Sequence, residues 1–471
     1  MSDPFDLLIT GGRIVTPQGV ITGEIAVRGE SIAAIGTDLG PAKTTVDATG
    51  KYVMPGGVDP HAHIEQMSGM GVMNADTFET ATQSAALGGT TTVISFAAQA
   101  EGQRIADAVV DYAASAKRGA MIDHAFHMIV RDTGVPHFDD DIARQMAMGH
   151  ISIKIFTTYN IKLSDADILH TMKRARGSGG LVCVHAENDA IIAEAKSALL
   201  AAGKTAPHFH AASHPRMAEI EAVERMCRFA EYLSQPVMVF HISTREGAEA
   251  IRAARARGAP IWAETCPHYL FMTDDILQQD GVEGAKFMCS PPQRTADDQA
   301  ALWDALNDGT LQVVSSDHAP YRFDETGKLS AGLDARFDQI ANGLPGLETR
   351  LPLMFDAMVS KGQGGPEAFA RLTASNAADI YGFATKGKLA VGMDADITLW
   401  DPKVTRTYGE NDLHDNVGYN PWAGREITGW PTDVWLRGNH IVQAGHFNAT
   451  PGSGAWLDRP DLGPFIAQQE V

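Results

Sequence analysis

The stretch Pro55-Gly-Gly-Val-Asp-Pro-His-Ala-His63 sets the pattern that decides the fold. It follows the apolar residues Tyr52-Val53-Met54, which are typical of a buried strand. Residues two apart in a strand point the same way, so His61 and His63 direct both imidazoles at one point, as a metal site requires. Because a His-x-His pair by itself is more often structural, its meaning depends on whether the chain repeats the pattern of a buried strand that ends in a polar side chain.

Apolar runs of strand length recur along the middle of the chain, and segments of helical pattern separate them. Strands that alternate with helices predict parallel βα units, and eight of them predict a closed (β/α)8 barrel, that is, an α/β protein of the TIM-barrel type. An open doubly wound sheet is the alternative, but the chain has no GxGxxG or Walker A turn. The eight runs are Val53–Ile64, Thr91–Ala98, His124–Val130, Ile151–Thr157, Leu181–Glu187, Val237–Ser243, Ile261–Cys266 and Leu311–Ser316. The helical patterns include Ala75–Leu87, Arg104–Arg118, Asp165–Arg176, Arg216–Tyr232, Glu246–Arg257 and Ala296–Asn307.

Both ends of the chain have the pattern of short strands joined by turns. The first strand is expected to end at Gly11-Gly12, and strand-like runs return at 395–400 and 433–438. We therefore expect residues 1–55 and 386–450 to pair into one smaller β-sandwich domain. Residues 56–385 would form the barrel, and residues 451–471 a C-terminal arm.

The composition predicts a soluble globular enzyme. The net charge of -20 argues against binding to nucleic acid or to an anionic membrane surface. No window reaches the roughly 20 apolar residues of a membrane span, and the start of the chain does not resemble a signal peptide. The four cysteines show no CxxC spacing and are expected to be buried free thiols. We therefore expect a cytoplasmic protein.

Polar side chains end several of the predicted barrel strands, and active sites of such barrels lie at the carboxyl ends of the strands. Each of these residues alone also has a structural explanation, such as a buried core histidine or a helix N-cap. Together they predict a metal site. The residues are His61, His63, Lys154, His185, His241 and Asp317.

Lys154 lies within the apolar run Ile151-Ser-Ile-Lys-Ile-Phe156. A buried ammonium is costly unless it is paired or neutralised. One interpretation is a lysine that extends to the rim. The other is a desolvated amine of lowered pKa that reacts with CO2 to give a carbamate, whose two oxygens can bridge two cations.

With these residues at the strand ends, the chain resembles the amidohydrolase superfamily, in the group with a carboxylated lysine and two metals. Within it, local phrases resemble the cyclic amidases, that is, hydantoinases and dihydropyrimidinases. These phrases are the opening stretch, Gly88-Gly-Thr-Thr-Thr92, His185-Ala-Glu-Asn188, Glu264-Thr-Cys-Pro267, Cys289-Ser-Pro-Pro292 and Ser316-Asp-His-Ala-Pro320.

The resemblance implies a ligand set and a reaction. His61, His63 and Asp317 would hold one divalent metal, His185 and His241 the other, and the Lys154 carbamate would bridge them. Zinc is the usual metal of the family, although these ligands also suit Mn, Co, Ni or Fe. A hydroxide shared by the metals would open the ring of hydantoins or dihydropyrimidines to N-carbamoyl amino acids, with Asp317 as general base and acid.

The resemblance also implies substrate-binding residues. Tyr159 would stabilise the oxyanion, and main-chain groups of Ser290 and Asn342 would hold the ring amide. Glu65 stands where dihydroorotases carry an arginine for the substrate carboxylate. A carboxylate there would repel an anionic substrate, so a dihydroorotase is disfavoured. We further hypothesise that Met67, Met70 and Phe156 line the pocket for the substituent of the ring.

Three alternatives stay open. Allantoinase, or another cyclic-imide or ureide amidohydrolase, is one, because Ser316-Asp-His-Ala-Pro320 occurs in the allantoinase branch too. The collapsin response mediator proteins share the fold without the metal ligands, whereas all expected ligands are present here, which favours an enzyme. A mononuclear deaminase is disfavoured by Lys154 as a bridging ligand. The family usually forms homotetramers, so we expect a homotetramer or a dimer.

Overall fold

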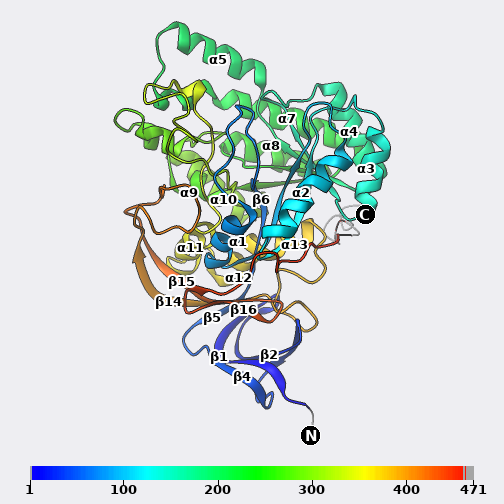
Figure 1. Cartoon of the computed structure of the whole chain (residues 1–471), viewed down its shortest axis with the longest axis vertical. Helices are drawn as coiled ribbons and strands as arrows, with labels where there is room; N and C mark the ends of the chain where they lie inside the picture. Colours follow the sequence, from blue (N-terminus) through cyan, green and yellow to red (C-terminus); the bar gives the residue numbers. More distant parts are fainter. Residues whose placement is uncertain (1–2, 460–461, 463–471) are drawn as a thin grey trace.

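A computed structural model of the chain describes residues 3–459 and residue 462 (Figure 1). Eight parallel strands pair in sequence order from β6 to β13. A parallel bridge between Ala62 and His318 joins the first strand to the segment after the last. The predicted (β/α)8 barrel is thereby confirmed. Its strands are β6 (Gly57–Ala62), β7 (Thr90–Ala98), β8 (Asp123–Ile129), β9 (Ser152–Phe156), β10 (Leu181–His185), β11 (Val237–Val239), β12 (Ile261–Thr265) and β13 (Val313–Val314).

The barrel strands are apolar runs because both of their faces are buried. Side chains such as Val58, Ile94, Phe96 and Trp262 fill the interior, and a larger cluster packs between the strands and the surrounding helices. The barrel is therefore a packed core, and ligands can reach it only at its rims.

The helices that cover the barrel begin at side-chain caps where the sequence offers them. Thr77 caps α1 and Thr295 caps α10, each in a capping box, and Asn188 caps α5. The six predicted helical segments are confirmed, and α3 and α5 are additional. The longer helices are α1 (Phe78–Leu87), α2 (Ile105–Gly119), α3 (Phe138–Ala147), α4 (Asp165–Gly177), α5 (Asp189–Ala201), α7 (Arg216–Leu233), α8 (Arg245–Ala256) and α10 (Ala296–Asn307). The short ones are α6 (His210–Ser213), α9 (Pro267–Phe271), α11 (Arg350–Phe355), α12 (Gly365–Ala370) and α13 (Asn376–Ile380), with π-helical turns at Asp356–Ser360 and Arg371–Ser375 and 3-10 turns at Pro207–Phe209, Asp274–Leu277, Glu283–Phe287 and Phe337–Gln339.

Strands from both chain ends form the smaller β domain, which lies below the barrel in Figure 1. They pair in one nine-stranded sheet of order β17-β16-β15-β14-β5-β1-β2-β3, with β4 on β1. Leu7, Ile25, Val53, Ile397 and Trp435 contribute to its core. The strands are β1 (Phe5–Thr16), β2 (Gly19–Arg28), β3 (Ser31–Gly36), β4 (Ala42–Asp47), β5 (Tyr52–Pro55), β14 (Ile397–Thr407), β15 (Glu426–Leu436), β16 (Asn439–Gln443) and β17 (His446–Phe447).

The expected strand end at Gly11-Gly12 is wrong, because β1 continues through it. The register of β1 against β2 shifts between Ile9 and Gly12, and Gly11 has a φ of 71°. Before this bulge β1 pairs with β4, and after it β1 pairs with β5. The two glycines therefore let one strand change partners instead of ending it.

A buried ion cluster joins the β domain to the barrel. The ammonium of Lys386 lies 2.6 Å from Asp123 at the start of β8, 2.8 Å from Asp394 and 2.9 Å from Asp396. The exact domain limits, 1–55 with 386–450 and 56–385, stay a prediction.

Residues 451–459 of the predicted C-terminal arm pack on the barrel of the same chain. The His124 amide donates to the Ala455 carbonyl and the Leu457 amide to the His124 carbonyl, at 2.9 and 2.8 Å. The rest of the predicted arm, residues 460–461 and 463–471, lies outside the described residues. Within the described chain, no helix combines the length and apolarity needed to cross a membrane.

Candidate active site at the carboxyl rim of the barrel

The structure brings the six predicted metal ligands to one rim of the barrel. His61 lies in β6 with His63 just beyond it, Lys154 lies in β9, and His185 ends β10. His241 and Asp317 follow β11 and β13. All six therefore lie at or near the carboxyl ends of their strands.

Asp317 lies at the centre of this group. Its Oδ1 is 3.0 Å from Nε2 of His61 and 3.6 Å from Nε2 of His63. Donor atoms of His61, His241 and Asp317 lie within 4.8 Å of one another, and all three residues are buried. The rings of His185 and His241 are 4.5 Å apart. Burial disfavours ionisation of Asp317, but attraction to His61 and hydrogen bonds with both histidines outweigh it and hold the pKa of Asp317 well below its usual range.

Three of the histidines have one ring nitrogen held by a neighbouring side chain. Nδ1 of His61 lies 2.6 Å from Oε1 of Glu264, and Nδ1 of His63 lies 2.6 Å from Oε1 of Gln66. Nε2 of His185 lies 2.8 Å from Oε2 of Glu187. Each contact fixes the ring orientation and leaves the other nitrogen as a possible ligand, as is usual for histidines that bind metals.

Lys154 is buried among aromatic rings. Its Nζ lies 3.8 Å from the ring centre of Phe240 and 4.9 Å from that of Phe156. Among the described residues it has no hydrogen-bond partner, and neither has the buried Nδ1 of His241. Burial lowers the pKa of Lys154 to about 7. An unpartnered buried amine and an unpartnered buried imidazole nitrogen, beside a carboxylate, fit a site that holds cations.

The backbone is strained at the same place. Positive φ angles are uncommon outside glycine, yet Tyr159, His241 and Asp317 have φ values of 70°, 41° and 45°. Strain of this kind persists where the surrounding structure enforces it and is frequent at active sites.

The three residues predicted to bind the substrate lie together. Nδ2 of Asn342 donates to Oγ of Ser290 at 3.0 Å, and the Tyr159 hydroxyl lies near both side chains. The ring of Tyr159 lies 5.2 Å from that of His185, which places all three beside the predicted ligands. Burial raises the pKa of Tyr159 well above its ordinary value, so its hydroxyl remains a hydrogen-bond donor.

The main chain around Ser290 is held on both sides of this residue. The carbonyls of Met288, Cys289 and Pro291 accept hydrogen bonds from Lys328, His210 and Tyr269, respectively. The N–H and C=O groups of Ser290 have no partner among residues 3–459 and 462. Since buried backbone groups are nearly always paired, these two are available to a ligand.

The structure corrects one argument from the sequence. Oε1 of Glu65 accepts a hydrogen bond of 3.0 Å from the amide of Phe78, at the start of α1. Its carboxylate is thus engaged at a helix N-terminus, where a negative charge is favoured. The argument from repulsion by Glu65 is therefore wrong. The remaining argument against an anionic substrate is that position 65 does not carry an arginine.

The methionine-rich segment beyond Glu65 forms a loop closed by a bridge between Met67 and Met73. Met67 and Met70 are about half exposed, whereas Phe156 is buried. The side chain of Asn160 donates to the Gly69 carbonyl at 3.0 Å, which fastens the loop next to Tyr159. Their role in lining a substituent pocket stays a prediction.

Sequence reasoning assigned no role to Glu187, Gln66 or Glu264, the residues that hold the histidine rings. Glu264 carries the clearest signal, because it is the only charged residue in the apolar run Ile261–Cys266. Gln66 lies in an irregular loop, where spacing predicts no contact.

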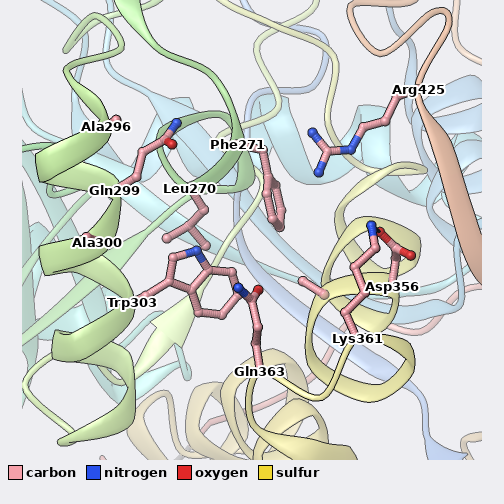
Figure 2. Close-up of a pocket in the computed structure, with 11 residues that line it drawn as sticks. Leu270, Phe271, Ala296, Gln299, Ala300, Trp303, Asp356, Lys361, Gln363 and Arg425 are labelled. Atoms are coloured by element: carbon pink, nitrogen blue, oxygen red, sulfur yellow. Dashed lines mark hydrogen bonds and ion pairs between the residues drawn. The ribbon is translucent and has the colours of Figure 1, made fainter.

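A separate cleft of about 360 Å³ lies between α9, α10 and the π-helical turn Asp356–Ser360 (Figure 2). Arg425 points toward Phe271 there, with its guanidinium 4.5 Å from the ring centre. Lys361 and Asp356 pair with each other at 2.6 Å. None of the predicted site residues lines this cleft.

Known proteins match this chain over nearly its whole length. Residues 52–441 match the model of the Amidohydrolase family. A D-hydantoinase from Rhizobium radiobacter is 38% identical over 461 residues, covering 96% of this chain and 99% of the relative. A D-phenylhydantoinase from Escherichia coli is 36% identical over 465 residues, covering 98% of this chain and 99% of the relative. The crystal structure of a dihydropyrimidinase from Brevibacillus agri superposes with a TM-score of 0.93 at 35% identity, covering 97% of this chain and 99% of that one. The chain therefore belongs to the amidohydrolase family, in its group of hydantoinases and dihydropyrimidinases.

Proposed function

We propose that this chain is a metal-dependent cyclic amidase that opens hydantoins and dihydropyrimidines to N-carbamoyl amino acids. The observation that carries this proposal is the grouping of four histidines, Asp317 and Lys154 beside Ser290. Among the described residues, neither the Lys154 amine nor the main-chain groups of Ser290 have a hydrogen-bond partner. The relatives named D-hydantoinase and D-phenylhydantoinase support it.

The residues would hold two divalent cations. His61, His63 and Asp317 would bind one and His185 and His241 the other, with Lys154 between them as a carbamate. Zinc is the metal that the family resemblance favours. When bound, such a pair supplies Lewis acidity and lowers the pKa of a shared water. The neutral amine that reacts with CO2 is accessible near neutral pH, because burial lowers the pKa of Lys154 to about 7.

The protein side chains would then position the ring and move the proton. Asp317 is ionised at neutral pH and can take a proton from the attacking water and deliver it to the leaving nitrogen. The Tyr159 hydroxyl can donate to the oxyanion that forms at the attacked carbonyl. The N–H and C=O of Ser290 and the main chain of Asn342 can hold the amide of the ring.

Ring opening by reconstituted enzyme tests this function. The protein is loaded with zinc, manganese or cobalt in bicarbonate, and metal content is measured beside turnover of dihydrouracil, hydantoin, 5-phenylhydantoin and allantoin. We expect about two metals per chain and turnover of the first three substrates. Turnover of allantoin alone would favour an allantoinase. A chain that binds no metal and opens none of the rings would contradict the proposal.

The assembly and location are also proposals. A homotetramer, or a dimer, follows from the resemblance, and light scattering after size exclusion measures it. A cytoplasmic location is supported by four cysteines that are all unpaired and buried.

A further inference from the structure

We propose that Lys328 is a positioning residue that fixes the two chain segments by which the enzyme holds the substrate ring. Its Nζ donates to the Met288 carbonyl at 3.2 Å and to the Ala341 carbonyl at 2.9 Å. Met288 is two residues before Ser290, and Ala341 directly precedes Asn342. One ammonium group therefore bridges both substrate-binding segments. This inference rests on the proposed function.

Lys328 comes from the loop that follows Asp317 at the rim, and it has no exposed surface. Its amide donates to the Arg322 carbonyl at 2.7 Å, which closes a turn and directs the chain inward. A Cβ on Gly327 would lie 2.1 Å from that carbonyl oxygen, so this turn needs glycine. The local backbone thus presents Lys328 to the two carbonyls.

The surroundings of Lys328 indicate that its two hydrogen bonds are the reason for a lysine at this position. No carboxylate pairs with it in the described part of the chain, and burial lowers its pKa to about 7. Burying an amine without a counter-charge costs free energy, and here only its two hydrogen bonds offset that cost. Both the charged and the neutral amine carry enough N–H groups for two carbonyls, so the bridge persists in either form.

The bridge also explains which groups remain free. The Met288 carbonyl accepts a second hydrogen bond of 2.8 Å from the amide of Gly343, the residue after Asn342. The Met288 carbonyl therefore links its own segment to that of Asn342 in two ways, through Lys328 and through the direct hydrogen bond from Gly343. The carbonyls on both sides of Ser290 are thus engaged, whereas its own main-chain groups have no partner in the described part of the chain and are held ready for a ligand.

Loss of the bridge should weaken the binding of the ring more than the chemical step. We compare Lys328→Met, which removes both hydrogen bonds at similar volume, with Lys328→Gln, whose shorter chain reaches at most one carbonyl. Gln235→Met is the matched control. Nε2 of Gln235 also bridges two carbonyls, those of Gly180 and Pro236, both at 2.8 Å, but at the opposite end of the barrel strands.

We expect KM for the ring substrate to rise about tenfold in Lys328→Met and about threefold in Lys328→Gln, with kcat changed by less than about threefold. Gln235→Met should keep KM within about twofold. All variants should retain the metal content of the wild type.

The outcomes separate this inference from the proposed function. A wild type without ring opening overturns the function and the inference together. An active wild type with unchanged KM in Lys328→Met overturns the inference alone. If Lys328→Met does not fold, Lys328→Gln decides, and a KM equal to that of the wild type would contradict the bridge. A rise in KM of equal size in Gln235→Met would also contradict it.

Discussion

Glu264 and His61 form a buried pair in which the carboxylate holds the imidazole by its Nδ1 atom at 2.6 Å. Both residues are fully buried, and the other ring nitrogen of His61 faces Asp317 at 3.0 Å. A carboxylate in this position fixes the tautomer and the orientation of a metal-binding histidine. The pair therefore ties the candidate metal site to the interior of β12.

Replacing Glu264 should weaken metal retention. Without its carboxylate the His61 ring can rotate and loses basicity, so Glu264→Ala should lower metal affinity by about 10- to 100-fold, with Glu264→Gln in between. Competition with a chelator measures this affinity. Glu348→Ala is the control, because Glu348 holds His414 by Nδ1 at 2.9 Å and His414 is no candidate ligand. Equal losses of affinity in both alanine variants would contradict the assigned role.

The barrel could be predicted because its strands are buried on both faces, so each appears as an apolar run. Even β13, which has only two residues in strand conformation, lies within the predicted run Leu311–Ser316. The bulge at Gly11 could not be predicted, because a glycine pair indicates a turn as readily as a bulge. The choice depends on the partner strands β4 and β5.

The candidate ligands could be predicted because the carboxyl ends of barrel strands meet at one rim. The residues that hold them could not, since Glu264 and His61 come from different strands and are 203 positions apart in the sequence. Lys328 is similar: its partners are main-chain carbonyls, and these leave no trace in side-chain identity. Contacts of this kind depend on tertiary structure alone.

Replacing Lys154 should remove the proposed bridge between two cations. We expect Lys154→Ala to bind fewer than two metals per chain and to lose ring-opening activity by at least about 100-fold. After growth in ¹³C-bicarbonate, the wild type should show a carbamate carbon signal that the variant lacks. Lys162→Ala is the control, since this exposed lysine beside Asp189 belongs to the same rim segment. Two metals and full activity in Lys154→Ala would exclude the bridge.

Shortening Met67 and Met70 to alanine should change the preference among 5-substituted hydantoins. Both side chains are about half exposed on a loop fastened next to Tyr159. Removing their flexible apolar surface should shift the ratio of kcat/KM between aromatic and small substituents by about 10-fold or less. Met148→Ala removes an equally exposed methionine elsewhere and should leave the ratio unchanged. A flat profile across the substrate series would rule out the pocket hypothesis.

Asp298 should stabilise the fold in a pH-dependent manner. Its carboxylate pairs with Arg216 at 2.5 Å, accepts from the Arg245 amide at 3.0 Å and caps α10 through Thr295. Burial raises the pKa of Asp298, but the hydrogen bonds from Arg216 and Thr295 outweigh this and lower it below the ordinary 3.8. A lowered pKa stabilises the folded state above the unfolded-state pKa, and this contribution is lost as the pH falls through the folded-state pKa.

We therefore expect Asp298→Asn to lower the free energy of unfolding by roughly 1–3 kcal/mol at pH 7. The difference from the wild type should shrink as the pH falls below about 4, because the carboxylate then takes up a proton in the unfolded state while the folded state, with its lower pKa, still keeps the charge. Urea unfolding at several pH values measures both effects. Asp297→Asn changes the exposed neighbour in the same helical turn and should have a small effect at every pH. A difference that is constant from pH 7 to pH 3 would show that the charge of Asp298 is not responsible.

Arg459 should anchor the C-terminal segment to the barrel. It is fully buried, and it donates to the Phe126 carbonyl at 2.8 Å and to the Ser152 hydroxyl at 3.3 Å, at the start of the strand that carries Lys154. Arg459→Met keeps the apolar volume but leaves a buried carbonyl unpaired, so the free energy of unfolding should fall by roughly 1–3 kcal/mol. Arg28→Met is the control, because Arg28 makes similar contacts with the Asp3 carbonyl and the Phe5 ring at the surface, where water replaces them. Equal free energies of unfolding of the wild type and Arg459→Met in urea would show that Arg459 does not stabilise the fold through these contacts.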